Sequence, residues 1–292
     1  MSSLSADPTA VAGASFRHRF FQTKNTVFIC ALTILVAYVA VAVFSPLLAG
    51  DFVNINPTSR LIPPGSGHWF GTDQMGRDIF ARTLVGTRNS LVVGGSVAIL
   101  TTVIGTTIGL LAGYFQIGEW LIMRIMDGLM AIPGVLLAIA FASLIGGGIG
   151  TVIIAIIIPE IPRMVRLVRS IVLSLKEQTY VVAAVSLGTR TWKILVRHIL
   201  PNAVGSLTVQ ATYVAASAII TEAILSFLGI GSTADSPSWG MIMSQGRLYF
   251  QIAPWILFFP GLFLSFMVLT VNILGDSLRD TLDPRLKNLT DK

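Results

Sequence analysis

The stretch Tyr180–Asn202, YVVAAVSLGTRTWKILVRHILPN, is a polar segment between two strongly apolar ones. Its spacing predicts a short helix over about 179–187 that ends at Gly188, because glycine readily adopts the positive φ of a helix terminator. A second helix is expected to start near Thr191. Pro201 then stands where the next apolar helix begins, a position at which its missing N–H costs nothing. We therefore predict a compact helix-turn-helix between two membrane helices.

The apolar segments around this stretch decide the fold class. The chain has 292 residues, of which 53% are hydrophobic and only 12% are charged, whereas soluble domains carry roughly a quarter charged residues. Each charge-free run is long enough for a membrane helix, which needs about 20 apolar residues, and too long for a strand of a membrane barrel. Five runs contain no Asp, Glu, Lys or Arg: 25–50, 89–118, 128–159, 199–221 and 248–275. The sequence therefore predicts an all-α membrane protein.

Six transmembrane helices follow from these runs. The run 128–159 is too long for one helix and contains Gly146–Gly150, where glycines favour a turn, so we divide it. With the N-terminus inside, 15 of the 20 basic residues fall in the inside segments, and Lys and Arg collect on cytoplasmic loops. We therefore predict that both termini are cytoplasmic (N-in, C-in). The expected spans are 26–48, 90–115, 121–145, 150–172, 204–228 and 254–275.

The fourth span is the least regular. Prolines and charged residues between 159 and 163 interrupt it after about ten apolar residues. We expect its cytoplasmic end to project beyond the bilayer as a helix that carries Arg163, Arg166 and Arg169 on one face. The alternative is a re-entrant hairpin, whose backbone is tolerated only where protein or water covers it.

No repeat or low-complexity linker divides the chain, so we treat residues 25–284 as one transmembrane domain. Residues 1–24 form a polar cytoplasmic tail, and the run after them is too long for the roughly 7–15-residue core of a signal peptide. We therefore expect an uncleaved first span. Residues 50–88 are predicted to form an outside loop, residues 173–202 a cytoplasmic loop and residues 285–292 a cytoplasmic tail.

Charge and side-chain chemistry exclude several kinds of partner and site. The net charge of +6 is explained by the cytoplasmic loops of a membrane protein, so it does not indicate a nucleic-acid partner. Cys30 is the only cysteine and therefore supports neither an intramolecular disulfide nor a cysteine-based metal site. His18, His68 and His198 fall on different sides of the membrane in this topology, so we expect no metal site and no nucleophile–base pair.

The segment His68–Leu91, HWFGTDQMGRDIFARTLVGTRNSL, shares one feature with a nucleotide site. Gly71 and Gly76 have the spacing of a phosphate loop, but Arg77 and Asp78 replace the Lys and the Ser/Thr of such a loop. No strand precedes the segment, so we expect no nucleotide and no other cofactor on this chain. The residues that follow predict an amphipathic interfacial helix, with Ile79, Phe80, Leu84 and Val85 opposed to Arg77, Arg82 and Arg88.

Four acidic residues lie in or beside the predicted spans, where carboxylates are costly and often functional. Glu222 has no basic residue near it in the sequence, and we favour a helix-packing or pore-side role for it. The alternative is a proton relay in a stand-alone secondary transporter. Local pairing explains the other three: Asp127 with Arg124, Glu160 with Arg163, and Asp276 with Arg279.

Tyr180–Asn202 also resembles the EAA loop, the cytoplasmic segment by which permease subunits of bacterial ATP-binding-cassette importers dock onto their ATPases. The likeness rests on Ala183-Ala184, on Gly188 and on Leu200-Pro201. Val182 stands at the position of the Glu that gives the loop its name, and His198 replaces the usual Ile.

Further segments extend the likeness over nearly the whole chain, from about residue 25 to 284. The chain resembles the C-type permease subunit of dipeptide/oligopeptide ATP-binding-cassette importers, which implies the type I importer architecture. The segments are His68–Leu91, Glu222–Gly231 (EAILSFLGIG), 236–240 (SPSWG) and 272–284 (NILGDSLRDTLDP).

This resemblance implies a bacterial inner-membrane subunit that imports dipeptides or oligopeptides, with glutathione or nickel complexes as alternatives, and does no chemistry itself. It implies a sister permease subunit as heterodimer partner, an external solute-binding protein, and two ATPases that bind ATP and Mg²⁺. The residues implied for ATPase coupling are Val182, Ala183, Ala184, Gly188, His198, Leu200 and Pro201. Those implied for a contact or gate on the external side are Gly71, Asp73, Gly76, Arg77 and Asp78.

Overall fold

The structure, a computed structural model, describes residues 8–48, 52–231 and 237–282. The predicted C-terminal tail 285–292 and residues 1–7 of the N-terminal tail lie outside the described residues. The long helices are α1 (Pro8–Leu48), α2 (Ile79–Tyr114), α3 (Gln116–Met130), α4 (Gly134–Ile145), α5 (Ile149–Lys176), α8 (Leu200–Phe227) and α10 (Trp255–Leu282). The short ones are η1 (Pro57–Ser59), α6 (Thr179–Ser186), α7 (Thr191–Ile194), η2 (Leu195–Ile199), α9 (Trp239–Gly246) and η3 (Arg247–Tyr249).

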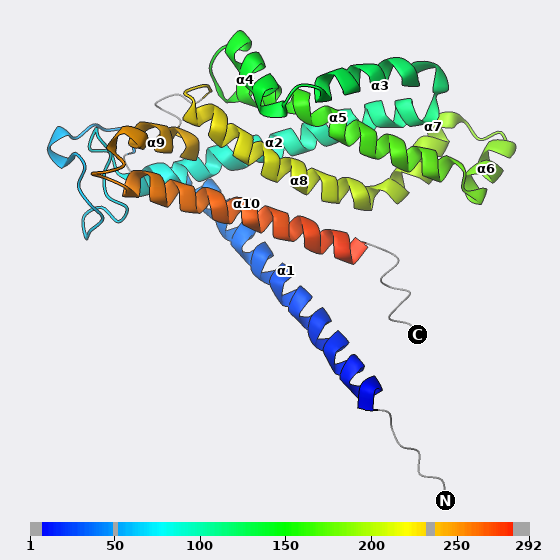
Figure 1. Cartoon of the computed structure of the whole chain (residues 1–292), viewed down its shortest axis with the longest axis horizontal. Coiled ribbons are helices and arrows are strands. Elements are labelled where there is room, and N and C mark those ends of the chain that lie inside the picture. Colours follow the sequence, from blue (N-terminus) through cyan, green and yellow to red (C-terminus); the bar gives the residue numbers. More distant parts are fainter. Residues whose placement is uncertain (1–7, 49–51, 232–236, 283–292) are drawn as a thin grey trace, which may run out of the picture.

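The long helices run back and forth between two ends of the molecule (Figure 1). α2, α5 and α8 pack side by side, α10 lies against α8, and α1 crosses the group at an angle. The loop 52–78 and α9 lie at one end, whereas α6 and α7 lie at the other. The protein is therefore an all-α, multi-pass membrane protein, as predicted, while the count of six spans and the side of the termini stay predictions. Within residues 8–48, 52–231 and 237–282, four helical stretches are long and apolar enough to cross a membrane alone: Thr26–Leu47, Ile79–Tyr114, Thr191–Phe227 and Trp255–Thr281.

The third predicted span is broken rather than straight. α3 and α4 form a pair that is bent by 91°. Pro133 explains the break, because proline has no N–H for the helix and disfavours a helical conformation at the residue before it, Ile132. The prediction of one helix over 121–145 is therefore wrong. The turn after α4 is as predicted, since Gly146 and Gly148 have φ values of +108° and +119°.

α5 is one continuous helix from Ile149 to Lys176. Its first 18 residues hold Glu160, Arg163 and Arg166, so composition alone does not mark it as a span, although at 1.5 Å per residue it is roughly 42 Å long. The prediction that the fourth span continues as a helix past its apolar part is confirmed. The alternative, a re-entrant hairpin, is not what α5 forms.

α2 begins at Ile79 and continues to Tyr114, so the interfacial helix and the second span, predicted as separate elements, are one. Asp78 caps it, because its side chain accepts a hydrogen bond from the backbone N–H of Ala81 at 3.0 Å. The interpretation of this segment as an amphipathic surface helix is wrong. Arg82 is only 1% exposed and lies as deep as its apolar neighbours.

The loop predicted to be cytoplasmic, residues 173–202, enters α8 through an unbroken helical run, so α8 does not begin at about residue 204 as predicted. The π-helical turn η2 follows α7 directly, and α8 begins at Leu200. Pro201 cannot donate to the preceding turn, and its ring crowds the carbonyl four residues earlier. A π turn opens the helix at that point, which explains how a run that contains Pro201 stays helical.

Close packing of α2 on α5 forms the centre of the fold. Small residues let membrane helices approach one another closely, and glycines repeat here at every fourth position of α2. A Cβ on any of them would lie 2.6–2.7 Å from a side-chain atom of α5, so α2 and α5 fit only with glycine there. We call these contacts the glycine seam: Gly105 against Met164, Gly109 against Val168, and Gly113 against Val172.

Candidate functional site

The loop between α5 and α8, which the sequence predicts to be cytoplasmic, has the predicted helix-turn-helix form. α6 ends at Ser186, and Gly188, two residues later, has a φ of +73°. The backbone N–H of Thr189 donates to the carbonyl of Ala184 at 3.0 Å, and that of Gly188 donates to the carbonyl of Val185 at 2.9 Å. These two hydrogen bonds terminate α6, and this kind of helix end requires a residue in the left-handed conformation, here Gly188. Gly188 is thus required by the turn itself.

The loop has an inner face that belongs to the core of the protein. Val181 and Ala184 are 1% and 9% exposed, and Val181 packs in a buried cluster with Val172 of α5 and Ile194 of α7. Of the two adjacent alanines predicted for coupling, Ala184 thus faces the core of the protein. Ala183 is exposed. A charged residue at position 184 would disturb the packing inside the protein, so its effect on transport would not test docking of a partner.

The outer face of the loop is apolar and exposed. The exposed fractions are 50% for Val182, 51% for Val185, 86% for Leu187 and 72% for Trp192. We call these four residues and Ala183 the outer face. Contiguous apolar side chains in such positions mark contact surfaces. Of the residues predicted for coupling, Val182 and Ala183 lie in this surface.

The remaining predicted loop residues lie at the joint with α8. The ring of His198 lies 6.5 Å from that of Tyr180, and the His198 carbonyl accepts a hydrogen bond from the side chain of Asn202 at 2.7 Å. Leu200 packs against the inner cluster, and Pro201 is exposed. His198, Leu200 and Pro201 therefore shape the joint and do not extend the outer face.

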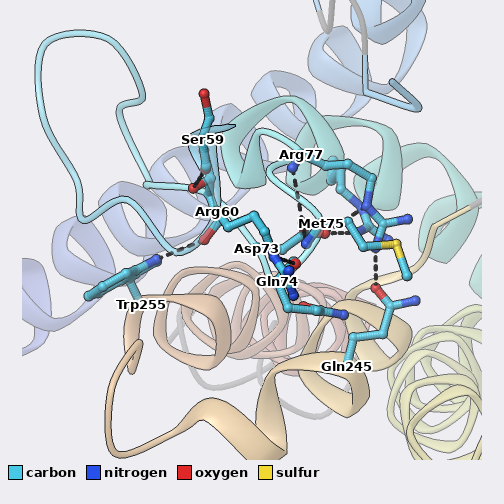
Figure 2. A network of polar contacts seen from close by, with 10 residues as sticks. Ser59, Arg60, Asp73, Gln74, Met75, Arg77, Gln245 and Trp255 are labelled. Carbon is cyan, nitrogen blue, oxygen red and sulfur yellow. Dashed lines mark hydrogen bonds and ion pairs between the residues drawn. The ribbon is translucent and has the colours of Figure 1, made fainter. Parts of the chain in front are cut away.

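The external motif folds into a polar network around Asp73 (Figure 2). Oδ1 of Asp73 accepts hydrogen bonds from the backbone N–H groups of Met75 (2.8 Å) and Arg77 (2.9 Å). Oδ2 accepts from Nε of Arg77 (2.7 Å) and from a terminal nitrogen of Arg82 (2.5 Å). Arg77 also donates to Oε1 of Gln245 in α9 at 2.9 Å. Since Asp73 is 1% exposed and both arginines are buried, one desolvated carboxylate joins the loop to α2 and, through Arg77, to α9.

Two glycines and Asp78 complete what we call the external cap, residues 52–78. Gly71 and Gly76 have φ values of +74° and +76°, and a Cβ on Gly76 would lie 1.8 Å from the carbonyl oxygen of Asn56. Oδ2 of Asp78 lies 2.8 Å from Nδ1 of His68. The cap therefore brings together all five external residues singled out in the sequence, Gly71, Asp73, Gly76, Arg77 and Asp78. The burial and turn geometry of these five residues explain why these residue types stand there. Their contact with a partner stays a prediction.

Three further residues belong to this network and were not predicted from the sequence: Arg82, Gln245 and Trp255. Nε1 of Trp255 donates to the carbonyl of Thr72 at 3.2 Å. Arg82 lies within an apolar stretch of helix, and this position could have indicated that it is buried. A buried arginine requires a buried carboxylate as its partner. Gln245 and Trp255 lie 168 and 183 residues from their partners, and no spacing in the sequence connects residues so far apart.

Glu160 and Asp276 both have partners in α8. Glu160 lies 3.3 Å from Arg163, as predicted, and also accepts a hydrogen bond from the hydroxyl of Ser217 at 2.9 Å. Asp276 accepts a hydrogen bond from the hydroxyl of Tyr213. Both carboxylates therefore link α8 to a neighbouring helix, α5 or α10.

Asp127 does not pair with Arg124, so that prediction is wrong. Its Oδ1 lies 2.6 Å from a terminal nitrogen of Arg166 in α5. The guanidinium of Arg124 instead lies 5.4 Å from the ring centroid of Trp120, a cation–π arrangement. Asp127 therefore joins two helices.

Glu222 is 3% exposed and holds three elements together. Its carboxylate accepts hydrogen bonds from the hydroxyls of Ser90 in α2 (3.2 Å) and Ser226 in α8 (2.7 Å), and the hydroxyl of Ser238, which precedes α9, also bonds to it. The cavity beside it has a volume of about 10 Å³, close to the least that one water needs. This arrangement favours the helix-packing role over contact with a solute.

Two substitutions of Glu222 distinguish a role in helix packing from a role as a proton relay. Glu222→Ala should lower the free energy of unfolding by about 1–3 kcal/mol, because it leaves buried hydroxyls without an acceptor. Glu222→Gln keeps one acceptor oxygen and should lose less. The thermal unfolding midpoints of the purified proteins in detergent test this. An unchanged midpoint for Glu222→Ala would contradict the packing role, and a stable but transport-dead Glu222→Gln would favour the relay.

Comparisons with known proteins agree with these features. Residues 105–288 match the model of the family described as binding-protein-dependent transport system inner membrane component. The chain is 51% identical to the probable peptide ABC transporter permease protein y4tQ of Sinorhizobium fredii, over 84% of each chain. It is 43% identical to the dipeptide transport system permease protein DppC of Alkalihalophilus pseudofirmus, over 95% of this chain and 92% of that one. It is 47% identical to the glutathione transport system permease protein GsiD of Pectobacterium atrosepticum, over 77% and 75%.

A solved structure shares the fold. A chain of the MetNI methionine ABC transporter in inward-facing conformations superposes with a TM-score of 0.57 at 19% identity, over 70% of this chain and 96% of that chain. At that identity the likeness concerns the fold alone. The family model covers more than half of this chain, and relatives above 40% identity cover most of it. The chain belongs to the family of binding-protein-dependent transport system inner membrane components.

Proposed function

We propose that this chain is one of two permease subunits of an importer that moves peptides into the cell and draws its energy from separate ATPase subunits. The family and the peptide, dipeptide and glutathione permeases among the relatives support this proposal. The observation that carries the coupling step is the outer face of the cytoplasmic loop. Its apolar side chains project from short helices whose opposite face is built into the membrane core.

The loop is suited to pass a displacement to the membrane helices. Val181 and Ile194 on its inner face pack in one cluster with Val168 and Val172 of α5 and with Leu207 of α8. α6 follows the end of α5 after a two-residue turn, and the glycine seam joins α5 to α2. A partner that moves the outer face would therefore move α5, α2 and the start of α8 together.

On this proposal the chain itself binds no cofactor. ATP and Mg²⁺ belong to the two ATPase subunits, which dock on the outer face. The sister permease completes the solute pathway. An external solute-binding protein delivers the solute at the end of the molecule that carries the external cap.

The solute class we propose is dipeptides or oligopeptides, with glutathione as the alternative that the glutathione permeases among the relatives suggest. The test is to purify the tagged chain with its associated subunits from the native membrane and to reconstitute the complex in proteoliposomes. ATP-dependent uptake of a labelled dipeptide, oligopeptide or glutathione, stimulated by a loaded binding protein, is the expected result. Uptake driven by a pH gradient without ATP would overturn the proposal.

A single exposed side chain tests the docking step. Leu187→Glu should cut co-purification of the ATPase subunits and ATP-dependent uptake at least tenfold, because it places a charge in the centre of an apolar contact. Its unfolding midpoint should not change, since Leu187 is 86% exposed. The matched control is Leu248→Glu, a leucine of similar exposure (82%) in η3, which directly follows α9. Full co-purification with Leu187→Glu would exclude the outer face as the docking surface.

A further inference from the structure

The two halves of the broken span are attached to α5 in different ways. α4 packs through apolar side chains, and Leu137, Ala138 and Ala142 are buried. Among the side chains described in α3, those of residues 118–130, Met126 alone is buried. The attachment of α3 to α5 is instead by charge, through two ion pairs: Asp127 with Arg166, and Glu119 with Arg169.

The geometry of these pairs is specific, but the groups are not sealed from solvent. The Asp127–Arg166 pair is 2.6 Å long, and its side chains are 53% and 45% exposed. Oε1 of Glu119 accepts hydrogen bonds from both Nε (2.8 Å) and a terminal nitrogen of Arg169, and these side chains are 26% and 30% exposed. Partly exposed ion pairs contribute little to stability. These ion pairs therefore orient α3 on α5, but little free energy is needed to separate the two helices.

The connection between α3 and α4 has the features of a hinge. The three residues 131–133 between them are all exposed, and the helix axis turns by 91° there. Gly128, just before the break, has no atom within 4 Å of the place where a Cβ would stand. A few loop residues at the end of an element are what absorbs the dihedral changes of a hinge motion.

We propose that α3 is a latch whose two ion pairs with α5 form in the conformation described here and break in another state of the transport cycle. α3 then shifts away from α5 between its two connections, Phe115 to α2 and residues 131–133 to α4, while the apolar contacts of α4 keep that half of the span on α5. Both arginines lie in the cytoplasmic half of α5, the helix that leads directly into α6. A displacement of the cytoplasmic loop therefore acts on the helix that holds the latch. This proposal rests on the proposed transport function.

Tethering the latch tests it directly. Glu119→Cys and Arg169→Cys are combined with Cys30→Ser, which removes the only native cysteine, in the full complex in membranes. A reducible bifunctional methanethiosulfonate reagent spans the gap, which is longer than a disulfide tolerates. We expect efficient cross-linking in the resting complex and a clear loss of cross-linking when ATP and vanadate trap the other state. The tether should reduce ATP-dependent peptide uptake about tenfold by holding one conformation, and reduction of the tether should restore it.

The two single-cysteine variants, treated in the same way, are the matched controls, because each loses the Glu119–Arg169 pair but cannot be tethered. Equal cross-linking in the resting and trapped states would overturn the latch, as would full uptake by the tethered complex. If the untreated complex takes up no peptide at all, the proposed function fails. The comparison of cross-linking in the two states still decides whether α3 moves.

Discussion

Gly109→Val is expected to lower the thermal unfolding midpoint and the yield of folded, monodisperse protein. A Cβ at position 109 would lie 2.6 Å from the Cβ of Val168 and 3.0 Å from the carbonyl oxygen of Val165. Neither atom moves by a side-chain rotation, so α2 and α5 must separate along the seam. Overpacking of this kind costs about 1–3 kcal/mol and sometimes more, which is a large part of the roughly 5–15 kcal/mol that stabilises a folded protein.

The control for this variant is Gly95→Val on the same helix. Gly95 is exposed, and no atom lies within 4 Å of the place that a Cβ at this residue would occupy, whereas the intrinsic cost of a β-branched residue in a helix is the same at both sites. Size-exclusion profiles and thermal midpoints in detergent compare the two proteins. Equal size-exclusion profiles and thermal midpoints for Gly109→Val and Gly95→Val would show that close packing at the glycine seam is not needed for stability.

Those parts of the fold that depend only on a local stretch of sequence could be predicted. Charge-free runs longer than a bilayer identify membrane helices whatever they pack against, and Gly188 ends α6 because its turn needs a positive φ. The glycine seam has a visible four-residue spacing in the sequence, but nothing in that spacing says that Val168 and its neighbours lie opposite. The bend at Pro133 was also open to prediction, since proline interrupts helices regardless of context.

Burial explains where the prediction of the site failed. Ala183 and Ala184 are equivalent in the sequence, yet only Ala184 faces the core, because the orientation of α6 is set by Val181 packing in the inner cluster. The local pattern predicts a surface helix for Arg82, because its ion-pair partner, Asp73, precedes the helix and lies outside that pattern. Inner and outer faces of short helices depend on tertiary contacts, which local patterns do not contain.

Asp73→Asn is expected to unfold the external cap. The substitution replaces Oδ2, the acceptor of the guanidinium bonds from Arg77 and Arg82, by an amide nitrogen that donates. Both arginines then stay buried without a counter-charge. Removing one partner of a buried ion pair costs about 3–5 kcal/mol, and here one carboxylate serves two cations, so the loss should fall at or above the top of that range.

Asp78→Asn is the matched control, because it makes the same chemical change five residues later at a site that is 25% exposed. Asparagine caps a helix about as well as aspartate, so the control should change stability by less than about 1 kcal/mol. The rate of tryptic cleavage after Arg77 and Arg82 in the reconstituted protein distinguishes them, since these buried arginines become substrates only when the cap opens. Cleavage as slow in Asp73→Asn as in Asp78→Asn would mean that the hydrogen bonds from Arg77 to Gln245 and from Trp255 to Thr72 hold the cap without the carboxylate. Faster cleavage in Asp73→Asn alone would establish Asp73 as the residue that joins the cap to α2 and α9.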